Sequence, residues 1–193
     1  MTATSSPSPG PMIAIVYESL FGNTRLIAET IADGIREQHM PVTVVPVAKA
    51  AALPECDVLV VGAPTHAHSL SSPASRTEAE RWALNPSRHL ALESGSLTTG
   101  VREWIELPPA ARHGYVAFDT RVDMPRIFTG AASSAIGRRL KKHGLREVLA
   151  AESFLVDKDS HLLPDEHDRA LRWGREIAAT TRALTGPSTR VHT

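Results

Sequence analysis

The chain has 193 residues, which is enough for one domain with a sizeable hydrophobic core. Lysine plus arginine number 21, and aspartate plus glutamate also number 21, so the net charge is zero with neutral histidines. This balance argues against nucleic acid or an anionic membrane as a partner, and no apolar run has membrane-spanning length. The single cysteine, Cys56, excludes an intramolecular disulfide and a cysteine-based metal cluster. It agrees with a reducing compartment, and we predict a cytoplasmic protein.

The two ends of the chain lack the pattern of a folded segment. Residues 1–11 are rich in serine and proline, without the basic start and apolar core of a signal peptide, which predicts a disordered tail. Residues 185–193 contain Gly186 and Pro187 and predict a second, flexible tail. The folded domain is therefore expected over residues 12–184.

Short apolar runs predict five strands, at residues 12–16, 42–47, 57–62, 115–119 and 148–156. Helical periodicity separates most of them, at residues 23–38, 73–83, 99–106, 131–143 and 165–184. Ser72 is the expected N-cap of the second helix, and Gly144 is the expected end of the fourth. Alternating strands and helices predict an α/β fold, a doubly wound parallel sheet with helices on both faces.

The loop between the first strand and the first helix has the features of a phosphate site. The first backbone N–H groups of a helix have no partner inside the helix, and they attract anions. The hydroxyls of Ser19 and Thr24 and the amide of Asn23 add donors, while Gly22 allows a ligand to approach closely. No lysine follows the glycine, as a nucleoside-triphosphate loop requires, and the three-glycine dinucleotide pattern is missing. The loop therefore favours a monophosphate, with a plain strand-to-helix turn as the alternative.

This segment, Ser19-Leu20-Phe21-Gly22-Asn23-Thr24, resembles the flavodoxin loop that holds the 5′-phosphate of FMN. Phe21 stands where that pattern usually has a second hydroxyl. The resemblance implies that all six residues belong to the cofactor site. It also implies a three-layer αβα sandwich whose five parallel strands have the order 2-1-3-4-5, and Pro46 suits the edge position of the second strand.

Two further loops resemble parts of flavodoxin-like FMN proteins. In this strand order a ligand binds beyond the carboxyl ends of the first and third strands. The segment after the third strand resembles a Gly-x-Pro-Thr motif, which implies contacts to the flavin ring from Pro64, Thr65, His66, Ala67 and His68. The end of the fourth strand would line the other side of the ring with Asp119, Thr120 and Arg121. Farther along, Phe128-Thr129-Gly130-Ala131 resembles the Phe-Cys-Gly-Ala run of short flavodoxins.

The ring site departs from the family pattern. Short flavodoxins usually stack the ring between a Trp or Tyr of the second loop and a Tyr of the third, and residues 64–73 and 119–125 contain neither. The remaining candidates for stacking are His66, His68 and Phe128. The three tryptophans lie in helical patterns and are predicted to pack in the core, at Trp82, Trp104 and Trp173.

These observations predict an FMN-binding redox protein that carries out electron transfer or a flavin-mediated reduction. Its redox partner or small-molecule acceptor is unidentified, no residue is assigned as an acid or base, and enzyme and electron carrier both stay open. The main alternative is a flavodoxin-like domain that binds FMN weakly or not at all and acts as a binding module.

Three other functions have less support in the sequence. A serine hydrolase could use Ser19, His66 or His68, and Asp119, but the Gly-x-Ser-x-Gly elbow is missing. A metal at His66 and His68 would lack a carboxylate or cysteine nearby in sequence. A phosphoryl-receiving regulator would need an acidic pair after the first strand, and Glu18 has no acidic neighbour.

Overall fold

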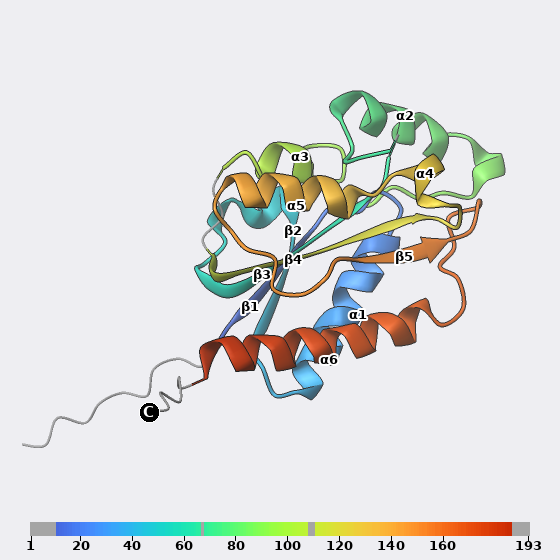
Figure 1. Cartoon of the computed structure of the whole chain (residues 1–193). Coiled ribbons are helices and arrows are strands. Elements are labelled where there is room, and N and C mark those ends of the chain that lie inside the picture. The colour runs from blue at the N-terminus through green and yellow to red at the C-terminus, as the bar shows by residue number, and fades with distance from the viewer. Residues whose placement is uncertain (1–10, 67, 108–110, 187–193) are drawn as a thin grey trace, which may run out of the picture.

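The computed structural model describes residues 11–66, 68–107 and 111–186. Five parallel strands form one sheet in the order β2-β1-β3-β4-β5, with layers of helices on its two faces (Figure 1). The strands are β1 (Ile13–Tyr17), β2 (Val42–Pro46), β3 (Cys56–Pro64), β4 (Ala111–Val122) and β5 (Glu152–Val156). The predicted fold class and strand order are confirmed.

The two faces of the sheet carry different helices. Side chains of α1 (Asn23–Glu37) and α6 (Glu166–Thr185) pack against one face, where Ile13 and Ile15 point. Side chains of η1 (Val47–Ala52), α3 (Val101–Trp104) and α5 (Ala132–Lys142) pack against the other face, where Ala14 and Val16 point. Because both faces are covered, β1 is buried along its whole length, which explains its continuous apolar sequence.

The hydrophobic core between the sheet and α6 contains an aromatic cluster. Phe118, Phe154 and Trp173 lie edge to face, with ring centroids 6.0 to 6.3 Å apart. This confirms the predicted core position of Trp173, and Trp104 packs against the opposite core. At the contact between α1 and α6, glycines Gly34 and Gly174 bring the two backbones together.

The element order also includes α2 (Pro73–Ala83), η2 (Pro86–Arg88) and α4 (Arg126–Thr129). Ser72 caps α2 as predicted, because its Oγ accepts a hydrogen bond from the Ser75 N–H at 3.2 Å. Within the described residues, no helix combines the length and apolar character needed to cross a bilayer. The predicted tails fall largely outside the described residues and stay predictions.

The predicted and observed bounds differ most in three elements. The fourth strand is longer than predicted, because its polar start pairs with β3 from Ala111 onward. The fifth begins at Glu152 and not at residue 148. The segment before β5 makes two backbone hydrogen bonds to β4 at Tyr115: the Val148 N–H donates to the Tyr115 carbonyl at 3.0 Å, and the Tyr115 N–H donates to the Arg146 carbonyl at 2.9 Å. The third helix is confined to Val101–Trp104.

Candidate functional site

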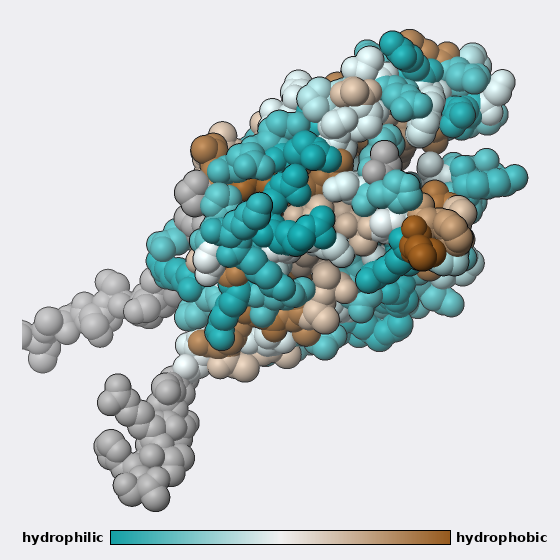
Figure 2. Space-filling model, turned by 45° about the horizontal axis from the view of Figure 1, so that its top comes forward, coloured by the Kyte–Doolittle hydropathy of each residue, from teal (hydrophilic) through white to brown (hydrophobic). Residues whose placement is uncertain are grey.

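A cavity of about 390 Å³ opens at the carboxyl edge of the sheet. The strand arrows of Figure 1 point to the right, and Figure 2 shows the surface hollowed at that end. The cavity has the size of a small-molecule or cofactor site. All three predicted loops contribute to its lining, through Ser19, Leu20, Phe21, Asn23, Thr24, Pro64, Thr65, His66, Thr120 and Arg121.

The first loop presents the start of α1 to this cavity. Gly22 adopts a left-handed backbone conformation with φ of +97°, and α1 begins at the next residue. The Gly22 N–H donates to Ser19 Oγ at 3.1 Å, which closes the loop on itself. In the described part of the chain, no side chain caps α1 and no acid lies in its first turn. An anion would therefore meet the positive end of the helix dipole with no acid in the first turn of α1, and the carboxylate beside Gly22, that of Glu93, is paired with Arg25.

Two side chains of this loop fasten it to the neighbouring loops. The Asn23 side-chain amide donates to the carbonyl of Ser160, after β5, at 2.6 Å. The Thr24 hydroxyl lies 2.8 Å from the Thr120 hydroxyl at the end of β4. Because these groups already have partners, the donors left for an anion are chiefly the backbone N–H groups and the Ser19 hydroxyl.

An aromatic side chain that the sequence analysis did not assign to the cavity also lines it. Trp82 lines the cavity together with Glu78, four residues earlier on α2. The Trp82 ring lies 5.7 Å from the His66 ring, and the Arg88 guanidinium lies 4.9 Å from its centroid. The prediction that Trp82 packs in the core is therefore wrong. Glu78 and Trp82 are four residues apart and therefore lie on one helix face, and this spacing was the only sequence feature that linked Trp82 to Glu78.

Two buried nitrogen atoms lack a hydrogen-bond partner among the described residues that line this cavity: His66 Nε2 and Arg121 Nε. Buried polar groups nearly always have partners, so these two point to a ligand with hydrogen-bonding atoms. Burial lowers the pKa of His66, although the negative charge of Glu78 opposes this shift. The imidazole is therefore held neutral near pH 7.

The lowered pKa of His66 predicts a dependence of stability on pH. The unfolded chain binds this proton at a higher pH than the folded protein does, so folding is favoured above the unfolded value near 6.5 and weakens as the pH falls below it. We expect the Tm to fall between pH 7 and pH 5 by less in His66→Gln than in the wild type. Calorimetry checks this, with the exposed His68→Gln as control. Equal slopes for all three proteins would contradict it.

Among the described residues, three members of the predicted site do not line the cavity as expected. Asp119 is fully buried, and its carboxylate accepts hydrogen bonds from the N–H and the hydroxyl of Ser133 at the start of α5. We therefore remove Asp119 from the cofactor contacts. Gly22 shapes the loop without lining the cavity, and His68 is exposed, with its backbone bridged to Gly130. Ala67 lies outside the described residues.

Of the three candidates for ring stacking, only His66 lines the cavity. Phe128 is 64% exposed on α4 and lies outside the lining. The residues that the sequence missed come from α2, the end of β4, and β5 with its following loop; they are Glu78, Trp82, Val122, Val156 and Ser160. Val122 directly follows the predicted Arg121, whereas the other four lie in segments to which no motif drew attention.

The structure does not support the serine hydrolase alternative, because Asp119 is not placed to act as the acid of the triad. Among the described residues, no hydrogen bond joins Asp119 to His66: Asp119 Oδ2 accepts from Ser133, and its buried Oδ1 has no partner. Among the described residues, no three histidine, cysteine, aspartate or glutamate side chains gather closely enough to hold a metal ion.

The strand order and the position of the cavity define a flavodoxin-like α/β protein. A family model described as a flavodoxin domain matches residues 14–142, which is more than half of the chain. The chain therefore belongs to this family of flavodoxin domains. No curated protein sequence matches it.

Solved structures share the fold at low sequence identity. The flavodoxin of Streptococcus pneumonia TIGR4 is 18% identical, with a TM-score of 0.58 over 87% of this chain and 98% of that one. Oxidised flavodoxin 1 from Bacillus cereus is 17% identical, with a TM-score of 0.57 over 87% and 97%. A flavodoxin, WrbA-like protein from Agrobacterium tumefaciens is 15% identical, with a TM-score of 0.56 over 91% and 99%. At such identities the likeness concerns the fold alone.

Proposed function

We propose that the cavity binds FMN and that the protein is a redox protein, acting as an electron carrier or in a flavin-mediated reduction. The observation that carries this proposal is the convergence of the three predicted loops around one cavity at the start of α1. Membership of the flavodoxin-domain family supports it. Location in the cytoplasm and an unidentified redox partner or acceptor belong to the same proposal.

The residues present fit the two ends of FMN. The backbone N–H groups at the start of α1 and the Ser19 hydroxyl would hold the phosphate. Trp82 and His66 would contact the ring from one side, and Thr120, Arg121 and Val122 from the other. The unpartnered Nε2 of His66 and Nε of Arg121 suit a ring that has several nitrogen and carbonyl acceptors.

A bound flavin supplies the ability to accept and release electrons, and the protein supplies binding and orientation. The walls of the cavity exclude part of the solvent, and Leu20, Phe21 and Val156 make its lining partly apolar. Neutral His66 offers a hydrogen bond without adding a full charge. We assign no acid or base, so the proposal covers both the carrier and the reductase.

Comparison of FMN with riboflavin tests the phosphate end of the site. We expect FMN to bind about tenfold to a hundredfold more tightly, because charge-assisted hydrogen bonds contribute about 1.5 to 3 kcal/mol. Titration with each flavin, followed by quenching of its fluorescence, measures the two Kd values. Equal affinities would contradict the phosphate site. No binding of either flavin would favour the alternative, a binding module without cofactor.

Two glycine variants provide a matched control for this titration. Gly22 and Gly144 both have positive φ, +97° and +81°, so alanine at either position costs about 1 to 2 kcal/mol of backbone strain. Added Cβ atoms meet no closer contact than 3.6 Å at Gly22 and none within 4 Å at Gly144. Only Gly22→Ala should reduce the preference for FMN over riboflavin.

A further inference from the structure

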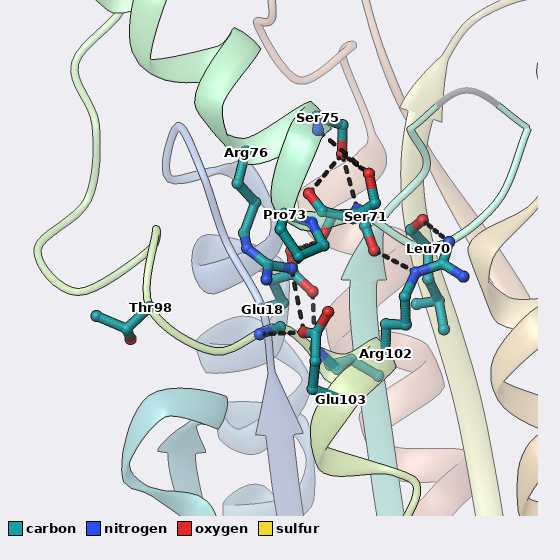
Figure 3. Close-up of polar contacts among 12 residues, drawn as sticks. Glu18, Leu70, Ser71, Pro73, Ser75, Arg76, Thr98, Arg102 and Glu103 are labelled. Atoms are coloured by element: carbon teal, nitrogen blue, oxygen red, sulfur yellow. Dashed lines mark hydrogen bonds and ion pairs between the residues drawn. The ribbon is translucent and has the colours of Figure 1, made fainter.

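A buried network lies directly behind the proposed phosphate loop. Glu18, the residue before Ser19, is 2% exposed and accepts hydrogen bonds from the hydroxyl of Ser71 and from the N–H of Val101, the latter at 2.8 Å. Figure 3 shows Ser71, Arg76 of α2 and Glu103 of α3 close to Glu18. Burial raises the pKa of Glu18, and these hydrogen bonds and the charge of Arg76 oppose that shift.

Arg76 is the centre of this network. It is 3% exposed, and its Nη1 donates to the Ser71 hydroxyl at 3.0 Å and lies 3.2 Å from the Glu103 carboxylate (Figure 3). Arg102 donates to the carbonyls of Leu70 and Ser71, which fixes the segment before α2. A buried guanidinium needs such partners, and Nη1 has two, whereas Nε has none among the described residues; the contacts of Nη1 therefore determine where the group lies.

The same arginine is one of the few attachments of α2. Within this helix only Arg76 and Ala79 are buried, whereas Glu78 and Trp82 face the cavity and Glu80 and Arg81 face solvent. Trp82 lies six residues beyond Arg76, which is about 9 Å along a helix axis. A tilt of about 10° at Arg76 would move Trp82 by roughly 1.5 Å, which is enough to lose much of a ring contact.

We infer that Arg76 is a positioning residue of the cavity. Held by Ser71 and Glu103 next to Glu18, it fixes α2 so that Trp82 and Glu78 face the ligand. The network therefore joins the loop at the phosphate end to the helix at the ring end. The effect on flavin binding rests on the proposed function, and the placement of α2 does not.

The test compares Arg76→Met with Arg81→Met, which removes an exposed arginine from the same helix. Hydrogen exchange of the α2 amides, measured without flavin, should become at least tenfold faster in Arg76→Met and stay unchanged in Arg81→Met. Arg76→Met should raise the Kd values of FMN and riboflavin by the same factor, about tenfold, because it acts at the ring end. In the Trp82→Ala background, Arg76→Met should raise the Kd little further, because both substitutions remove the same contact between Trp82 and the flavin.

An equal loss of affinity in the wild-type and Trp82→Ala backgrounds, or unchanged exchange in α2, would overturn the inference. If Arg76→Met does not fold, Glu103→Gln weakens the same ion pair from a side chain that is 38% exposed, and the same effects should appear at smaller size. If the wild type binds no flavin, the proposed function fails, and the exchange measurement alone still decides whether Arg76 positions α2.

Discussion

Replacing Trp82 with alanine is expected to weaken FMN binding by about thirtyfold. An aromatic contact contributes about 0.5 to 1.5 kcal/mol beyond burial of area, and the lost apolar area adds a similar amount, so roughly 2 kcal/mol is at stake. Trp82 is the aromatic ring best placed for this contact, because it lines the cavity beside His66. Fluorescence titration with FMN measures the change in Kd.

The control for this prediction is a tryptophan outside the cavity. Trp104 packs against the core on the α3 side and does not line the cavity, so Trp104→Phe should leave the Kd within about twofold. Trp82→Phe keeps a smaller ring and should lose less affinity than Trp82→Ala. A Trp82→Ala protein with wild-type affinity would show that the ring of FMN lies elsewhere.

The fold and the backbone of the loop before α1 were predictable because their signals are local. The apolar run of β1, the glycine at position 22 and the helical periodicity of α1 are adjacent in sequence. Each feature indicates the backbone conformation of its own segment, and together they predict a strand, a turn and the start of a helix. The strand order needed the resemblance, because periodicity contains no information on which strands are neighbours.

Trp82 shows why the α2 side of the cavity was not predictable. Its helical pattern is shared by core tryptophans such as Trp173, which is 5% exposed. What distinguishes Trp82 is the placement of α2, and this depends on buried contacts of Arg76 with residues from two other segments. No property of the α2 sequence alone indicates which face meets the cavity.

Asp119 illustrates a second limit of sequence interpretation. It lies within β4, three residues before the end of the strand, and a polar residue near a strand end has two possible partners, a ligand or the start of the next helix. The unsatisfied N–H groups of α5 decide the matter, since Asp119 and Thr65 accept hydrogen bonds from Ser133 and Ala132. These N–H donors compete with a ligand for Asp119, and the sequence around Asp119 does not indicate that the start of α5 lies beside it.

Substitution of Gly174 by alanine is expected to lower the free energy of unfolding by about 3 kcal/mol, at the upper end of overpacking effects. A Cβ at this position would lie 2.2 Å from the carbonyl oxygen of Ile31, so α1 and α6 would have to separate. Urea unfolding measures the change. Ala179→Val, on the exposed side of α6, is the control and should cost less than about 0.7 kcal/mol.

The same substitution also tests whether the helix contact supports the proposed cofactor site. The proposed phosphate loop ends where α1 begins, and Asn23 and Thr24 on the first turn bond to the loop after β5 and to the end of β4. If α1 moves as a rigid body, Gly174→Ala should weaken FMN binding more than riboflavin binding, even at temperatures where the variant is fully folded. Loss of stability with both affinities unchanged would mean that the strain is absorbed near Gly34, before it reaches the first turn. A variant as stable as the control would mean that α6 moves at no measurable cost, which the close backbone contact argues against.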